Sequence, residues 1–120
     1  MPHPELGVLT IGERLLVDRR RRGHTQADAA RRWGISQSRY SRWERELDTP
    51  TLEELPYLWA PAKGHQLRGN ERCLLYRRRA GLTQLHIATE LGRCKMWVRQ
   101  MERGEVSFTE LLDYWEGTDK

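Results

Sequence analysis

An internal repeat constrains the fold of this chain more than any other sequence feature. Residues 13–44 are echoed by residues 71–102, with matching positions 58 residues apart. Three identical pairs mark the register of the repeat: Thr25-Gln26 and Thr83-Gln84, Gly34 and Gly92, and Glu44 and Glu102. A repeated segment indicates one structural unit that is used twice. We therefore expect two similar units in the chain.

Length and charge limit what these units can be. The chain has 120 residues, and units of about 50 residues lie near the lower limit for independent folding. The formal net charge is +4, and arginine runs at residues 19–22 and 77–79 occupy matching positions of the repeat. Basic residues on one part of each unit suit an anionic polymer, although such runs also occur as solvated helix faces.

Hydrophobic spacing, glycines and capping residues predict helices and no strands. We expect helices at residues 13–22, 25–33, 36–45 and 51–58, and then at 71–79, 83–91, 94–103 and 107–115. Capping boxes are expected at Thr25, Thr51 and Ser107, and Ser36 is expected to cap its helix. The predicted fold is all-α, with two tandem four-helix units that form a pseudo-dimer. Their predicted bounds are residues 10–59 and 69–116, with a linker at 60–68.

Both copies have the residues that a DNA-reading helix needs behind it. The shared pattern is a small residue where two helix axes approach, a glycine for a tight turn, and apolar residues on the rear of the next helix. In chain order these are Ala30, Gly34, Tyr40 and Trp43, and then Ala88, Gly92, Val98 and Met101. The other side of that helix is left for polar contacts in a major groove about 12 Å wide.

With these residues the chain resembles the lambda-repressor-like (Xre-type) helix-turn-helix family. The resemblance rests on Thr25-Gln26, on Gly34-Ile35-Ser36, on Tyr40 to Glu44 and on the stretch TPTLEEL at residues 49–55. It covers most of residues 12–59 and, less closely, residues 69–115. It implies a transcriptional regulator that binds double-stranded DNA sequence-specifically.

The resemblance also implies roles for individual side chains. Gln26 and Gln84 would contact a phosphate. In the first copy the resemblance places Gln37, Ser38 and Arg42 at base-reading positions and Arg45 near the DNA backbone. Arg39 and Ser41 join the predicted DNA-binding residues because they lie on the same outer face of the third helix. In the second copy the predicted DNA-binding residues are Lys95, Met96, Trp97, Arg99, Gln100 and Arg103. Arg19, Arg77 and Arg93 are further candidates for phosphate contacts.

The second copy departs from the family pattern at two positions. Arg93 replaces Ile35, which would be buried beneath the turn, and Cys94 replaces the helix cap Ser36. The loss of such a cap typically costs about 1 kcal/mol. Either this turn is rearranged, with Arg93 turned outward to a phosphate, or the second reading head is weak.

Little other chemistry is indicated by the sequence. We expect Cys73 in the core and Cys94 in a turn, without a disulfide between them. Since nothing pairs a nucleophile with a base, we expect no enzymatic activity, and also no cofactor and no metal. There is no apolar run at the N-terminus and no stretch approaches the roughly 20 apolar residues of a membrane span. The expected location is the cytoplasm or nucleoid of a bacterial host.

Two classes of function stay open. The first is a small phage or bacterial repressor, a monomer that binds an asymmetric DNA operator as a single-chain pseudo-dimer, without a small-molecule ligand or a membrane. The second is a protein-interaction module, such as an antitoxin or an adaptor, that uses one helix-turn-helix to bind a protein. Trp97, which stands at the position of Arg39, fits both, since it could stack on DNA or cover the neighbouring repeat.

Overall fold

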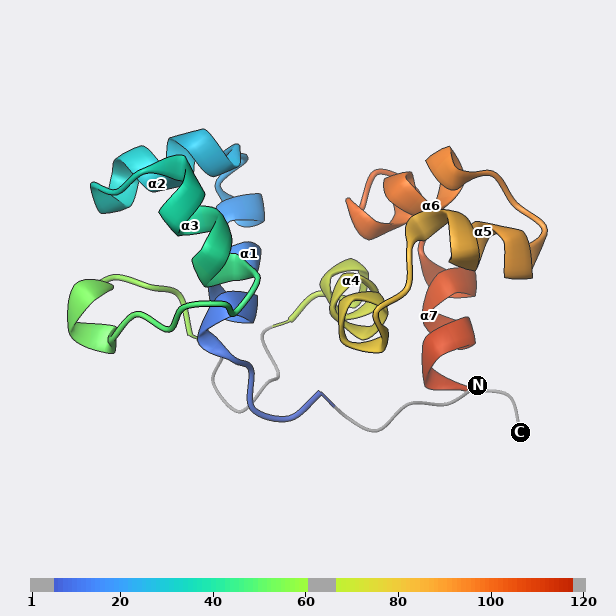
Figure 1. Cartoon of the computed structure of the whole chain (residues 1–120). Helices are drawn as coiled ribbons and strands as arrows, with labels where there is room; N and C mark the ends of the chain where they lie inside the picture. Colours follow the sequence, from blue (N-terminus) through green and yellow to red (C-terminus); the bar gives the residue numbers. More distant parts are fainter. Residues whose placement is uncertain (1–5, 61–66, 118–120) are drawn as a thin grey trace. The chain divides into compact units, whose positions relative to one another are not determined.

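The computed structural model describes residues 6–60 and 67–117, and all regular structure in them is helical (Figure 1). These residues form two compact units. The first holds the described residues of 8–63, and the second holds those of 1–7 together with those of 64–120. The prediction of an all-α fold is confirmed. The pseudo-dimer and the predicted unit bounds stay predictions, and residues 61–66 of the predicted linker lie outside the described residues.

The first unit consists of α1 (Ile11–Arg21), α2 (Gln26–Trp33), α3 (Gln37–Glu44) and the short 3-10 helix η1 (Leu52–Glu54). The predicted caps of α2 and α3 are confirmed. The Thr25 side chain accepts the Asp28 N–H at 3.1 Å and Asp28 accepts the Thr25 N–H at 3.1 Å, while Ser36 caps α3. Helix α1 begins earlier than predicted, because Thr10 and Glu13 form a capping box of their own.

The core of the first unit is formed by α1, α2, α3 and the segment after η1. Its buried members are Leu15, Ala29, Ala30, Tyr40, Trp43, Leu55 and Leu58, with Ile11, Trp33 and Ile35 packed against them. Tyr40 is fully buried, and its hydroxyl donates to the Leu15 carbonyl at 3.3 Å. The predicted inward orientation of Tyr40 and Trp43 is thus confirmed, and it leaves the opposite side of α3 at the surface.

The predicted fourth helix of the first unit is wrong. The capping box of Thr51 and Glu54 forms, but the helix that it opens is only the single turn η1. Pro56 explains the early end, since proline donates no N–H and disfavours helical geometry in the residue before it. That residue has φ −127° and ψ 62°. The chain beyond is held at α1 instead, where Arg14 Nε donates to the Trp59 carbonyl at 2.9 Å.

The second unit consists of α4 (Gly69–Ala80), α5 (Gln84–Leu91), α6 (Lys95–Glu102) and α7 (Thr109–Glu116). Its fully buried side chains include Leu75, Ile87, Val98, Leu111 and Trp115. Cys73 is buried, as predicted, whereas Cys94 is exposed, and both are free thiols. Leu6 belongs to this unit too: it is buried, and its carbonyl accepts Arg79 Nη1 at 2.8 Å.

The turn between α5 and α6 has the same backbone as the turn between α2 and α3. Gly92 and Gly34 have φ of 67° and 72°, a left-handed geometry that favours glycine. Arg93 donates its backbone N–H into α5 at 2.8 Å, just as Ile35 donates into α2 at 3.0 Å. Arg93 is exposed, as the first alternative expected, but the turn that was expected to rearrange for this is unchanged. The second alternative, a weak second reading head, stays a prediction. The predicted loss of the cap is confirmed, because Cys94 makes no side-chain bond to α6.

Helix α7 begins later than predicted. The expected capping box of Ser107 and Glu110 does not form, because Phe108 is the residue that precedes the helix. Glu110 is instead paired with Arg93 at 2.8 Å. The Phe108 ring lies so close to Gly69, at the start of α4, that a Cβ on that glycine would clash with it. The start of α7 thus has an aromatic contact with α4 where the sequence indicated a polar cap.

Candidate nucleic-acid interface

The outer side of α3 is polar and open to solvent. The structure brings the predicted DNA-binding residues of the first copy together there; we call this set the α3 face: Gln37, Ser38, Arg39, Ser41, Arg42 and Arg45. All are exposed except Ser41, which is half-buried. The opposite side of the helix is occupied by the buried Tyr40, Trp43 and Glu44. Only the polar side is therefore available to a ligand, although the DNA contacts themselves stay predictions.

A buried carboxylate joins α1, α2 and α3. Glu44 is 5% exposed, and it accepts Arg19 Nε at 2.6 Å and Nη2 at 3.3 Å. Gln26 Nε2 donates to the same carboxylate at 3.1 Å, and Arg19 Nη1 donates to the His24 carbonyl at 3.1 Å. Arg19 and Gln26, both predicted phosphate contacts, thus have partners within the unit. Their role toward DNA stays a prediction.

The second unit repeats this network with the corresponding atoms. Glu102 is 1% exposed, and it accepts Arg77 Nε at 2.7 Å and Nη2 at 3.0 Å. Gln84 Nε2 donates to it at 3.0 Å, and Arg77 Nη1 donates to the Leu82 carbonyl at 3.0 Å. Two-bonded arginine–carboxylate contacts are directional, so the network fixes the helix before the turn against the helix after it. Sequence reasoning missed this role, although the shared 58-residue spacing of all three residues signalled it.

Acidic residues that follow α3 hold its exposed arginines. Arg42 donates to Asp48 from Nε at 2.7 Å and from Nη2 at 3.3 Å. This hydrogen bond lowers the pKa of the Asp48 carboxyl below its ordinary value. Arg39 Nη2 lies 3.6 Å from Glu54 Oε1, and the Arg39 guanidinium carbon lies 5.3 Å from the centre of the Trp43 ring. These pairings could not be predicted from the sequence, because they depend on where the turn after α3 places each acid.

The corresponding side of α6 is less polar. Its predicted contact residues, the α6 face, are Lys95, Met96, Trp97, Arg99, Gln100 and Arg103, of which Trp97 and Gln100 are half-buried and the rest exposed. Arg93 bonds Glu110 through Nη2 at 2.8 Å, and its guanidinium carbon lies 4.9 Å from the centre of the Trp97 ring. Arg93 and Trp97 thus have partners within the unit, while their contacts with DNA stay predictions.

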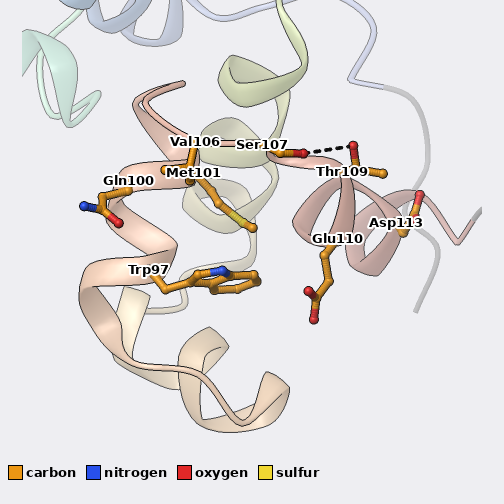
Figure 2. Close-up of a pocket in the computed structure, with 8 residues that line it drawn as sticks. All are labelled: Trp97, Gln100, Met101, Val106, Ser107, Thr109, Glu110 and Asp113. Carbon is orange, nitrogen blue, oxygen red and sulfur yellow. Dashed lines mark hydrogen bonds between the residues drawn. The ribbon is translucent and has the colours of Figure 1, made fainter.

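An open groove of about 580 Å³ runs beside α6. Its lining residues are Trp97, Gln100, Met101, Val106, Ser107, Thr109, Glu110 and Asp113. Figure 2 shows Trp97 and Met101 reaching from α6 toward the start of α7, where Glu110 lies. The lining thus combines apolar side chains of α6 with the carboxylates Glu110 and Asp113 of α7, and these carboxylates make the groove poorly suited to a phosphate.

Residues 18–56 match the family model described as helix-turn-helix. This match covers about a third of the chain, and all of it lies in the first unit. The matched residues include Arg19, Gln26, Glu44 and the whole α3 face. Comparisons with curated proteins and with solved structures gave no match. None of the helices in the described residues is long and apolar enough to cross a membrane.

Proposed function

We propose that the protein is a sequence-specific double-stranded DNA-binding transcriptional regulator, a small phage or bacterial repressor. One observation carries the proposal: the exposed polar α3 face lies within the residues that match the helix-turn-helix family. In this motif the second helix lies in the major groove and reads base edges, while the first crosses the DNA backbone. Since the core occupies the rear of α3, its polar face is the side that meets DNA.

Arg42 is the main base-reading residue in this proposal, because arginine can donate two parallel N–H groups to guanine. Gln37 and Ser38, at the start of α3, read neighbouring base edges. Arg45 follows the helix and approaches the DNA backbone. Gln26 keeps a second amide hydrogen, which reaches a phosphate while the first stays on Glu44.

The second unit acts as a second, different reading head, so that a single chain binds as a pseudo-dimer. The repeated carboxylate network supports this, because it braces α6 as it braces α3. A homodimer presents one recognition helix twice and reads a palindrome. Here Met96 replaces Ser38 and Gln100 replaces Arg42. Methionine suits a thymine methyl and glutamine suits adenine, so the operator is asymmetric.

Selection of bound sequences from random duplex DNA, followed by affinity measurements over a salt series, tests the proposal. Affinity should fall steeply with salt, because phosphate contacts release counterions. Arg42→Ala should relax the preference at one base pair, whereas Arg45→Ala should weaken binding to all sequences alike. Binding that selects no sequence, or that ignores salt, would contradict the proposal.

A protein-interaction module is the second candidate, and apolar exposure in the second unit favours it. Leu85 is 59% exposed and Met96 is 52% exposed, at the positions of Ala27 and Ser38 in the first copy. In this candidate the second unit binds a protein, as an antitoxin or an adaptor does. A DNA footprint confined to one half-site, together with a partner bound at high salt, would favour it.

A further inference from the structure

The Arg42–Asp48 pair leaves one edge of the arginine open. Asp48 accepts from Nε at 2.7 Å and from Nη2 at 3.3 Å, so both bonds lie along the side edge of the guanidinium. A guanidinium carries five N–H donors in one plane. The donors that Asp48 does not take are on Nη1 and on the outer side of Nη2. Two of them point in parallel off the end of the side chain.

The turn after α3 determines where Asp48 lies. Leu47 N–H donates to the Arg42 carbonyl at 2.9 Å, and Glu46 N–H donates into the last turn of α3 at 3.1 Å. Glu46 has φ 63°, in the left-handed region, and Pro50 is buried two residues beyond Asp48. The carboxylate therefore comes from a defined turn at the end of the helix that carries Arg42.

The second unit has the same kind of turn without the ion pair. Gly104, with φ 74°, closes the end of α6 through the equivalent hydrogen bonds. The positions 58 residues after Arg42 and Asp48 hold Gln100 and Val106, which cannot form an ion pair. The turn therefore does not require the ion pair, which leaves Asp48 free to act on Arg42 at the surface of α3.

We propose that Asp48 is a specificity-determining residue that acts through Arg42. Asp48 holds Arg42 so that the end edge of the guanidinium faces a guanine, and it blocks phosphate from the side edge. This inference rests on the proposed function. Guanine O6 and N7 accept two parallel N–H groups, which the end edge offers. A phosphate binds a guanidinium through two oxygens, as a carboxylate does, and Asp48 already occupies the side edge, one of the two edges that offer such a contact.

The effect of Asp48 belongs to binding rather than to folding. The two side chains are 50% and 47% exposed, and an exposed ion pair adds little stability in water. When DNA covers the α3 face, water leaves and the interaction between the two charges strengthens. The same negative charge repels phosphate. Removal of the charge should therefore strengthen binding to random DNA and weaken the choice of base.

The test is sequence selection from random duplex DNA with the full-length protein and the variants Asp48→Asn and Arg42→Ala. Glu105→Gln is the matched control, since it removes the same charge from an exposed ion pair, Arg103–Glu105 at 3.3 Å. The wild type should select guanine at one base pair, and Arg42→Ala should lose that choice. Asp48→Asn should reduce it at the same base pair at least about fivefold, near the lower end for a two-bonded arginine–guanine contact. Glu105→Gln should leave it unchanged.

Two further measurements separate positioning from a general change in charge or folding. Asp48→Asn should bind random DNA as tightly as the wild type or more tightly, with an unchanged thermal midpoint. In the Arg42→Ala background it should have no further effect on base choice, since coupled residues deviate from additivity. Undiminished guanine choice in Asp48→Asn, or a base preference that does not depend on Arg42, would overturn the inference and leave the proposed function standing. Failure of the wild type to select any sequence would overturn both.

Discussion

The Arg19 guanidinium donates two N–H groups to the buried Glu44 carboxylate, at 2.6 and 3.3 Å. A buried charge that loses its partner carries a large desolvation penalty, so this contact adds to the apolar core and to the Tyr40–Leu15 hydrogen bond in holding α1 against α3. Arg77 and Glu102 stand in the same relation in the second unit. In each unit a buried ion pair therefore links the first helix to the third.

Arg19→Ala should lower the free energy of unfolding by about 3 kcal/mol, because it leaves a buried carboxylate uncompensated. Arg77→Ala should have an effect of similar size. Urea denaturation followed by tryptophan fluorescence measures both. Arg103→Ala is the control, since its ion pair with Glu105 is exposed and such pairs contribute little. Equal losses for all three variants would show that burial of the carboxylate is not the cause.

Cys94→Ser should stabilise the protein by about 1 kcal/mol by giving α6 the side-chain cap that it lacks. Cys94 has φ −90° and ψ 159°, close to the φ −72° and ψ 157° of Ser36 in the first unit. The backbone is thus already suited to a serine cap. The reverse change, Ser36→Cys, should destabilise by a similar amount. Urea denaturation of both variants checks this, and a loss of stability in Cys94→Ser would contradict it.

The two cysteines should differ sharply in reactivity. Burial raises the pKa of the Cys73 thiol to about 12, whereas Cys94 is exposed. Because the thiolate is the reactive form, a thiol reagent near pH 8 should modify one cysteine in the folded protein and both after denaturation. Mass spectrometry of the digested protein locates the label. Rapid modification of Cys73 in the folded state would contradict its buried position.

The same pKa shift predicts how stability depends on alkaline pH. In the unfolded chain the Cys73 thiol ionises near its ordinary pKa of 9.0, whereas in the fold it stays protonated to about 12. Between these values the unfolded state binds fewer protons, so stability should fall as pH rises from 9 toward 12. Below pH 9 this group should have no effect. Thermal midpoints of the wild type and Cys73→Ala over this range test it, and the variant should lose less.

The free protein should be a monomer, since one chain carries both proposed reading heads. Without DNA, light scattering should give a mass near 14.2 kDa, the mass of one chain. In the complex, the protein part of the mass should again correspond to one chain. Footprinting should then show two half-sites of different sequence, the first richer in G·C and the second in A·T. A stable dimer in the absence of DNA, or a palindromic optimum bound by a single chain, would contradict the pseudo-dimer.

The helices and their caps could be predicted because their signals are local. Thr25 and Ser36 form the caps that their sequence neighbours indicate. The errors arose where a distant contact or a competing signal decided the outcome. Before Pro56 the helix ends after a single turn, although the capping box of Thr51 and Glu54 forms. At the start of α7 the predicted capping box is absent, and the Phe108 ring lies against Gly69.

The exposed residues of the candidate site could be predicted from the sequence, but the hydrogen bonds and ion pairs between them and their neighbours could not. Helical spacing alone places Gln37 and Arg42 on the outer side of α3, because the aromatic residues must face the core. The partners of the arginines could not be derived this way. The donor to Glu44 is Arg19, which lies 25 residues earlier in the chain, on another helix. Asp48 reaches Arg42 through a turn in which Glu46 has left-handed backbone geometry.

Leu6 precedes the first unit in the sequence, yet it is buried in the second, where Arg79 binds its carbonyl. Order along the chain and membership of a unit therefore differ. Proteolytic cleavage between Gly7 and Val8 would leave the first unit whole and detach part of the interior of the second. A fragment that begins at residue 67 would likewise lack one of its own hydrophobic side chains. The second half of the protein should consequently be less stable alone than in the intact chain, because part of its core comes from the N-terminal end of the chain.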